Sequence, residues 1–407
     1  MFVSMSRSLR AARLATFAYF ALNGFVLGAW IVHIPAVEER AGISHTVLGW
    51  LLLLLGAGAF VGMQLVGPLA DRFGARTVVP LSAAVCSVAL VLPALAVNAW
   101  TLGAALLVFG LGNGSLDVSM NTHAVQVEAR YKRPIMSAFH AVFSIGGVLA
   151  ALVGARTLSW GWSATATLTA VSVAALAVSV AAGTALLPRP EAPGASEPST
   201  ARTTTWRTTP LRIWALAALA LMLMLSEGVA NDWSVLAMRD VLDAPAATAA
   251  LAYGAFATAM TIGRFLTDRV AARFGPVAVV RYGSALAALA LTIVVLAPSI
   301  PVAIAGWVLF GLGLSGTIPQ LFSAAGHANP HAAGANVSRV AGLGYLGMLA
   351  GPAIIGPLTQ VMPLNHTFFL PVAFCVIAAL TAGILRPGTP QPRPQVTHPP
   401  AATVDAA

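Results

Sequence analysis

A long uncharged run is the feature that most constrains what this chain can fold into. Between Thr77 and Leu116 the sequence contains no Asp, Glu, Lys or Arg. About 20 apolar residues are enough for a helix to cross the hydrocarbon core of a bilayer. The composition agrees, because 58% of the 407 residues are hydrophobic and only 9% are charged, against about 25% in soluble domains. We therefore expect an all-α membrane protein.

Twelve apolar segments of this kind follow one another, separated by Pro, Gly, Asn or charged residues. The predicted spans are residues 12–36, 46–68, 78–98, 101–126, 135–156, 163–187, 211–236, 246–266, 277–298, 301–325, 334–361 and 366–386. An apolar run from Leu14 to Val37 follows three arginines, as in a signal peptide. It is long enough to cross a bilayer, so we expect it to be a retained first helix.

A segment rich in Pro, Ser and Thr divides the spans into two groups of six. The predicted units are an N-terminal bundle (1–187), a cytoplasmic linker (188–210), a C-terminal bundle (211–386) and a disordered cytoplasmic tail (387–407). Segments rich in Pro, Ser and Thr bury too little apolar surface to fold alone. We therefore expect the linker to be flexible.

The basic residues predict the orientation of these spans. With the N-terminus inside, the cytoplasmic segments hold all of the 22 Lys and Arg except Arg40, Arg156 and Arg239. An excess of Lys and Arg marks cytoplasmic loops. The formal charge of +9 therefore fits membrane orientation, and we expect no nucleic-acid partner. We expect a multi-pass protein of the cell membrane with both termini cytoplasmic, functional as a monomer.

The two halves repeat each other at a nearly constant offset of about 200 residues. The letters FGLG occur at Phe109–Gly112 and again at Phe310–Gly313. Ala70-Asp71-Arg72 in the first half corresponds to Thr267-Asp268-Arg269 in the second. Parallel repeats of six helices are typical of transporters whose site lies at the membrane midplane between the halves.

The loop after the second span reads GPLADRFGAR, from Gly67 to Arg76. It resembles the signature loop of the major facilitator superfamily, G-x-L-a-D-R-x-G-R-[RK], although Ala75 replaces one basic residue. The resemblance implies a major facilitator fold of 12 transmembrane helices in two pseudo-symmetric six-helix bundles. It also implies a gating latch, in which Asp71 caps a helix end and pairs with Arg across the halves, beside Arg72 and Arg76. The alternative is that these charges only fix the topology.

The second copy of this loop is degenerate, because Gly263 lies one residue further from Asp268 and Arg264 is inserted. Asp268 and Arg269 are therefore expected to form a weaker latch than the first copy.

Three further stretches carry a finer resemblance. Leu116–Asn121, LDVSMN, is similar to the L-E-T-x-x-N of the fucose:proton symporters in this superfamily. Glu227–Ser234, EGVANDWS, looks like the E-G-x-x-x-D-W-S of the branch containing the MosC and YbjJ membrane proteins, and Ser137–Gly147 fits the same branch. The fucose symporters have an acid in helix 1, whereas this chain has Asn23 there. Sugar specificity and coupling are therefore not carried over.

Asp117 lies deep in uncharged sequence, with Asn113 and Asn121 on the same helical face at i−4 and i+4. A carboxylate at the centre of a membrane helix costs about 2.5–3.5 kcal/mol on insertion scales, and such groups mark substrate or proton paths. Burial favours the neutral acid, so Asp117 and Glu227 are the predicted proton carriers. Asp117 could instead accept a hydrogen bond from substrate or tie helices together.

Other polar or aromatic residues on these helices complete the predicted substrate site. Besides Asn113, Asp117, Asn121 and Glu227, they are Asn23, Trp30, His140, Asn231 and Asp232. Trp30 could stack on a sugar ring or simply pack, and His140 could relay protons or be a satisfied interior histidine. Asp232 could be only an interfacial acid. Arg339 could neutralise an anionic substrate, although snorkelling to the cytoplasm is favoured.

We therefore expect a secondary active transporter that works by alternating access. Proton symport of a small polar solute, such as a sugar or sugar derivative, is favoured. The rival hypotheses are proton-coupled efflux of amphipathic compounds and a non-transporting membrane sensor. An enzyme is not expected, because no nucleophile–base pair or metal cluster is visible, and neither cofactor nor metal is expected. The expected partners are the solute, protons and the lipid bilayer.

Overall fold

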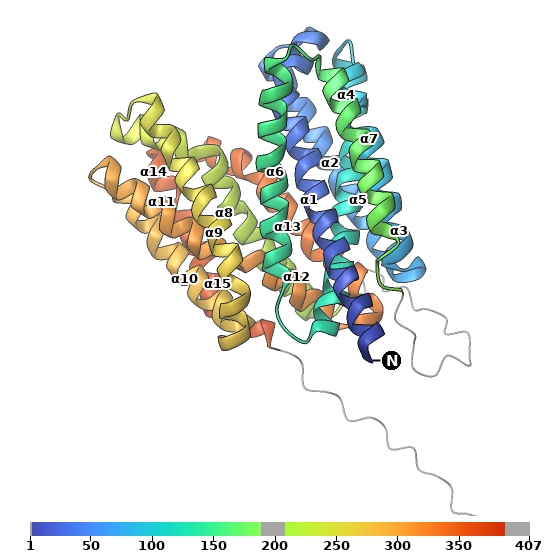
Figure 1. Ribbon diagram of the computed structural model, residues 1–407. Coiled ribbons are helices and arrows are strands. Elements are labelled where there is room, and N and C mark those ends of the chain that lie inside the picture. The colour runs from blue at the N-terminus through green and yellow to red at the C-terminus, as the bar shows by residue number, and fades with distance from the viewer. Residues whose placement is uncertain (1, 189–207, 387–407) are drawn as a thin grey trace, which may run out of the picture.

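The computed structural model describes residues 2–188 and 208–386, and every regular element in these two ranges is a helix (Figure 1). The first range holds α1 (Phe2–Ala41), α2 (His45–Phe73), α3 (Ala75–Ala89), α4 (Leu92–Leu95), α5 (Ala99–Tyr131), α6 (Met136–Ser159) and α7 (Ala164–Gly183). The second holds α8 (Leu211–Leu242), α9 (Ala246–Phe274), α10 (Pro276–Val295), α11 (Ile300–Leu314), α12 (Thr317–Ala328), η2 (Pro330–Ala332), α13 (Ala333–Leu358), α14 (Leu364–Thr367), α15 (Phe369–Thr381) and η3 (Ala382–Leu385). Nearly all of the predicted linker, and the predicted tail 387–407, lie outside the described residues.

Within the described ranges these elements form twelve rods, in the order of the twelve predicted spans. Short breaks divide three of the rods, into α3 and α4, α11 and α12, and α14 and α15. Ten of the twelve are long and apolar enough to cross a membrane by length and composition. The other two, α9 and α13, have 29 and 26 residues, which also exceeds the length that a membrane span needs.

Matching glycines end corresponding helices in the two halves. Gly74 after α2 and Gly275 after α9 both have φ 82°, and each N–H bonds to the carbonyl four residues earlier. A positive φ of this kind suits glycine, which has no Cβ. The same turn therefore stands at the same place in both repeats, as the internal symmetry of the sequence predicts.

The long helix α5 sets the depth of the central acid. It begins at a capping box, in which Asn98 Oδ1 accepts from the Thr101 N–H at 3.0 Å. It continues without a break for 33 residues, and Asp117 lies near its middle. Glycines on α5 let α2 approach closely, because a Cβ on Gly110 or Gly114 would lie within about 2.1 Å of a backbone oxygen of α2.

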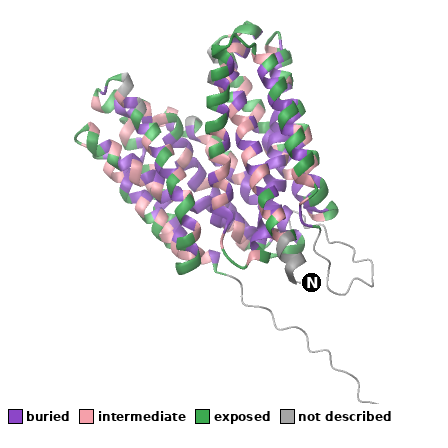
Figure 2. Cartoon of the chain, in the orientation of Figure 1, coloured by how far each residue is buried: buried purple, intermediate pink, exposed green. Residues whose placement is uncertain are grey.

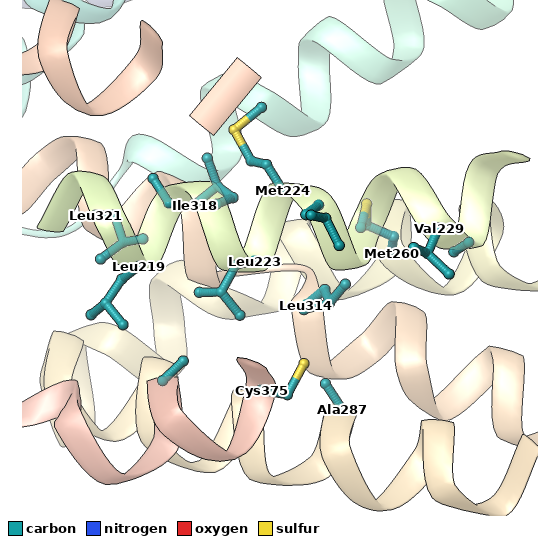
Figure 3. Packing of buried hydrophobic residues seen from close by; sticks show 14 of the residues in the cluster. Leu219, Leu223, Met224, Val229, Met260, Ala287, Leu314, Ile318, Leu321 and Cys375 are labelled. Carbon is teal, nitrogen blue, oxygen red and sulfur yellow. The ribbon is translucent and has the colours of Figure 1, made fainter. Parts of the chain in front are cut away.

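Two hydrophobic cores correspond to the two bundles. One core is drawn almost entirely from α1–α7, and the other mainly from α8–η3. Figure 3 shows the second core, where Leu223 of α8, Leu314 of α11 and Cys375 of α15 lie close together. Purple buried residues run along the inner sides of both bundles in Figure 2, while the outer sides are largely exposed, as lipid-facing surfaces of a membrane protein should be.

The bundles meet at one end of the molecule and separate toward the other (Figure 1). We call the end where they meet the linker face; it contains the start of α1 and the turns at Gly74, Lys132–Ile135 and Gly275. The opposite end, near α4 and α14, is the open face. The functional residues are described with respect to these two faces.

Candidate functional site

The polar row predicted on α5 is buried and partly paired. Asn113 is 6% exposed and donates from Nδ2 to Asn23 Oδ1 of α1 at 2.9 Å. Asp117 is 5% exposed, and its Oδ1 receives only a long contact of 3.4 Å from Asn121 Nδ2. Asp117 Oδ2 has no hydrogen-bond partner among the described residues. This carboxyl oxygen is therefore free to hold a proton.

A hydrogen-bonded chain leads from Asp117 to His140 of α6. Asn121 Nδ2 donates to the Asp117 carbonyl at 2.9 Å, which leaves its Oδ1 facing His140 Nε2 at 3.1 Å. With Asn121 Oδ1 as the acceptor, the proton of a neutral His140 sits on Nε2. The ring also contacts Phe322 of α12, with centroids 5.9 Å apart. His140 therefore lies where the two bundles meet.

Glu227 of α8 has an arginine partner that sequence reasoning placed elsewhere. Arg264 Nη2 lies 3.6 Å from Glu227 Oε1, and Nη1 donates to Ser144 Oγ of α6 at 2.8 Å. Both charged side chains are 16% exposed. From sequence we counted Arg264 with the basic residues of the cytoplasmic segments, and the structure shows its side chain in contact with Glu227 and Ser144 of neighbouring helices. One feature of the sequence pointed to a special role for Arg264: it is an extra residue relative to the first loop and lies one helical turn before Asp268.

Tyr345 of α13 lies near the same group, within range of the charges of Asp117, Glu227 and Arg264. Sequence reasoning missed it, since one tyrosine in an apolar span carries no distinctive signal. We call the following residues the central cluster: Asp117, Asn121, His140, Ser144, Glu227, Arg264 and Tyr345. They come from α5, α6, α8, α9 and α13, so both bundles contribute.

Three other predicted site residues take different positions. Trp30 is 2% exposed and packs edge to face on Phe109, with ring centroids 6.2 Å apart. Asn231 and Asp232 are exposed on α8, and within the described residues neither makes a hydrogen bond to the central cluster. Substrate contact by these residues stays a prediction.

Two aspartates connect the bundles at the linker face. Asp71 accepts from the Gly334 and Ala335 N–H groups at 2.8 and 2.9 Å, at the start of α13. Asp268 accepts from the Ser137 and Ala138 N–H groups at 3.0 and 2.7 Å, at the start of α6. A carboxylate is stabilised at a helix N-terminus by unpaired N–H groups and by the helix dipole.

The arginines of the two loops lie at more exposed positions than the aspartates. Arg72 stacks on Phe73 at 5.2 Å from the ring centroid, and Arg76 and Arg269 are exposed. Buried Arg339 lies within the electrostatic influence of Asp71. Each aspartate thus accepts two backbone N–H groups from the opposite bundle. The weaker second latch expected from sequence stays a prediction.

A third contact between the bundles involves Glu128 at the end of α5. Its Oε1 accepts from the Ile135 and Met136 N–H groups at 3.0 and 3.2 Å, and its Oε2 accepts from Ser323 Oγ of α12. His327 Nδ1 lies 3.8 Å from the same Oε2. A cavity of about 610 Å³ adjoins this group on the linker face, and it does not include the central cluster. The group strengthens the closed end of the molecule.

Within the described ranges, no three His, Cys, Asp or Glu side chains gather as metal ligands. The central cluster instead offers two carboxyls, one guanidinium and several neutral hydrogen-bonding groups between two bundles. Such a set can bind a polar molecule and exchange protons with it.

Comparisons with known proteins concern the family and the fold of the chain. The family model for the Major Facilitator Superfamily matches residues 14–231 and 216–405. The chain is 34% identical over 369 residues to the transporter y4wD of Sinorhizobium fredii, covering 91% of this chain and 97% of that protein. It is 30% identical over 379 residues to the membrane protein MosC of Rhizobium meliloti, covering 92% and 90%.

Solved structures show the same fold at low sequence identity. The transporter FucP in its outward conformation has a TM-score of 0.75 at 14% identity, covering 91% of this chain and 98% of that one. The proton:xylose symporter XylE has a TM-score of 0.71 at 13% identity, covering 92% and 95%. These matches are transporters and not enzymes. The chain belongs to the major facilitator superfamily of membrane transporters.

Proposed function

We propose that this transporter moves a small polar solute, such as a sugar or sugar derivative, together with protons. The observation that carries the proposal is the buried Asp117 carboxyl, with one oxygen unpartnered among the described residues and the other within reach of Asn121. A carboxyl of this kind can gain and lose a proton as the bundles move. Proton binding removes an uncompensated buried charge and lets the site pass apolar walls.

The central cluster supplies the rest of the coupling machinery. The chain of hydrogen bonds through Asn121 connects Asp117 to His140, which lies beside Phe322 of the other bundle. The Arg264–Glu227 contact adds a second acid whose charge depends on its partner. Solute hydroxyls can bond to the amide, imidazole and hydroxyl groups between these acids. Solute and proton would then bind close together, so that each can affect the binding of the other.

The arrangement of the two faces supports alternating access. Basic residues such as Arg72, Arg76 and Lys132 gather at the linker face, and Lys and Arg mark the cytoplasmic side. With this face inside the cell, both termini are cytoplasmic and the protein is open to the outside. The contacts of Asp71 and Asp268 would then hold the cytoplasmic side closed. We further infer that the monomer in the cell membrane is the working unit.

The names of similar proteins support a polar solute. One relative over 34% of this chain is a D-xylose transporter of Levilactobacillus brevis, and FucP is named a fucose:proton symporter. Another relative, over 37% of this chain, is a gentisate transporter of Corynebacterium glutamicum. Sugars and hydroxylated acids are therefore the first solutes to test.

The test measures external pH in weakly buffered cells that express the protein. Sugars, polyols and sugar acids are added one at a time, to wild type and to Asp117→Asn. Symport predicts alkalinisation by a solute in the panel, and its loss in the variant. Alkalinisation that persists in Asp117→Asn would remove the proposed proton role of this residue.

Silence across the panel would oppose symport and favour efflux of amphipathic compounds, measured as substrate-induced proton movement in everted vesicles. A membrane sensor would differ from both transport modes, because it would not catalyse counterflow of labelled solute in liposomes.

A further inference from the structure

Arg264 has more hydrogen-bonding capacity than its surroundings use. A guanidinium carries five N–H donors in a planar fork. One nitrogen donates to Ser144 Oγ at 2.8 Å and another approaches Glu227 Oε1 at 3.6 Å. The third nitrogen, Nε, is buried and has no hydrogen-bond partner among the described residues. The central cluster thus contains a cation with donors left for another acceptor.

The contact with Glu227 compensates this cation only in part. Charge-assisted N–H···O bonds usually measure about 2.7–2.9 Å, whereas the Arg264–Glu227 separation is 3.6 Å. An arginine inside a membrane bundle is costly unless its charge and its donors are satisfied. A bound anion that reaches Nε and Nη2 would complete what Glu227 leaves open.

The charges of the cluster set the condition under which an anion can enter. With Asp117 and Glu227 both ionised, the two acids outnumber the single guanidinium of Arg264. One proton brings the three groups to neutrality, and a second leaves Arg264 as an uncompensated cation. Protonation of Glu227 therefore removes the negative charge that competes with a solute carboxylate for Arg264.

We propose that the transported solute carries one carboxylate, which binds Arg264 in place of Glu227 when Glu227 takes a proton. This inference rests on the proposed function and names its substrate class. The planar fork of arginine matches a carboxylate with two parallel hydrogen bonds. The central cluster contains a single arginine and no lysine, which suits a monoanion better than a phosphate dianion.

The remaining groups of the cluster describe the rest of the solute. Asn121, His140, Ser144 and Tyr345 are neutral donors and acceptors. They suit hydroxyl groups, so the substrate class is a hydroxylated monocarboxylic acid, as in a sugar acid. One proton taken up with one such anion moves no net charge, whereas two protons with one anion move one positive charge.

The test compares matched acid and neutral probes on the purified full-length protein. Glucuronate is compared with glucose, and galacturonate with galactose, by binding titration at about pH 5.5 and pH 8. Each acid should bind at least tenfold more tightly than its neutral counterpart, and more tightly at the lower pH. Equal binding of acid and neutral probes, or no binding of either acid, would overturn the proposal.

Variants assign the preference to the arginine. Arg264→Gln should lose at least tenfold in affinity for the acids, and Arg264→Lys should recover part of that loss. Arg273→Gln is the matched control, because Arg273 lies on the same helix with an exposed side chain, and it should retain the preference. An acid preference that survives in Arg264→Gln would contradict the inference.

A second variant covers the case in which Arg264→Gln does not fold. Glu227→Gln removes the rival carboxylate, so it should raise acid affinity at pH 8 at least fivefold and flatten its pH dependence. Lower acid affinity in this variant would overturn the proposal.

Proton uptake measured on the same protein in liposomes separates the two proposals. Proton uptake with neutral sugars that needs Asp117 but not Arg264 would keep symport and overturn the carboxylate inference. Acid binding that depends on Arg264 and is tighter at the lower pH, without proton-driven accumulation in liposomes, would keep the carboxylate inference and overturn symport.

Discussion

Replacing both linker-face aspartates by asparagine should move the protein toward a state that is open at this face. Asp71 and Asp268 each accept two backbone N–H groups from a helix of the opposite bundle, at 2.7–3.0 Å. These bonds must break when the bundles part at the linker face. They therefore contribute to the difference in free energy between the two access states.

The size of the effect follows from these contacts. A hydrogen bond to a charged group contributes about 1.5–3 kcal/mol net, and a charge at a helix N-terminus about 0.3–1 kcal/mol. Asparagine keeps one acceptor oxygen but loses the charge, so we expect a loss of about 1–2 kcal/mol per site. The two sites contact different helices, so their effects should add to about 2–4 kcal/mol. That corresponds to a shift of about 30- to 1,000-fold in the equilibrium.

The assay is a distance measurement between spin labels on Thr77→Cys and Ala272→Cys, which lie at exposed positions of opposite bundles near the linker face. Cys86 and Cys375 are buried, so they are protected from labelling. The double variant should lengthen the label distance, and each single variant should do so less. Asp240→Asn is the control, because Asp240 is exposed and lies near the C-terminal end of α8, away from the linker face.

An unchanged distance distribution in the double variant would refute this reasoning. Asp71→Asn alone should also slow turnover, with less effect on substrate affinity, and unchanged turnover would remove the latch hypothesis. A clear difference between the two single variants would test the weaker second latch that the degenerate sequence predicts.

Two further predictions concern packing and the loop before α6. Gly24→Ala should destabilise the fold by about 1–3 kcal/mol, because the new Cβ would lie 2.0 Å from the Phe143 carbonyl oxygen. Gly254→Ala is the control and should not destabilise the fold, because a Cβ there would have no atom within 4 Å. Equal thermal unfolding of the two variants would contradict this prediction. Glu128→Ala should cost about 1–3 kcal/mol, because two backbone N–H groups lose their acceptor, whereas Ser323→Ala should cost less. Thermal unfolding in detergent measures both, and a larger loss in Ser323→Ala would oppose the argument.

The order of the helices could be predicted from sequence because hydropathy and helix breakers act locally. The repeat at Asp71 and Asp268 could also be found, since an Asp-Arg pair recurs after an offset of about 200 residues, although the second loop is degenerate. The structure adds that each aspartate meets the start of a helix in the other bundle. The partner of Asp71, at the start of α13, is more than two hundred residues away in the sequence. The residues there have no distinctive sequence pattern.

The central cluster could be predicted only in part, for a related physical reason. Asp117, Asn121 and Glu227 stand out because charged and amide groups are rare in apolar spans. Arg264 did not, because an arginine near a helix end is usually at the membrane surface, and sequence does not show the side chain reaching Glu227 and Ser144. Helical spacing gives the face of one helix, but the neighbour that this face meets depends on packing between bundles.

The most direct test of the central claim is solute accumulation by purified protein in liposomes under an imposed pH gradient. The solute is one identified by external alkalinisation, and wild type is compared with Asp117→Asn. We predict that wild type accumulates the solute and that Asp117→Asn does not, although the variant still exchanges labelled for unlabelled solute. Full accumulation by Asp117→Asn would contradict the claim that this carboxyl carries the coupled proton.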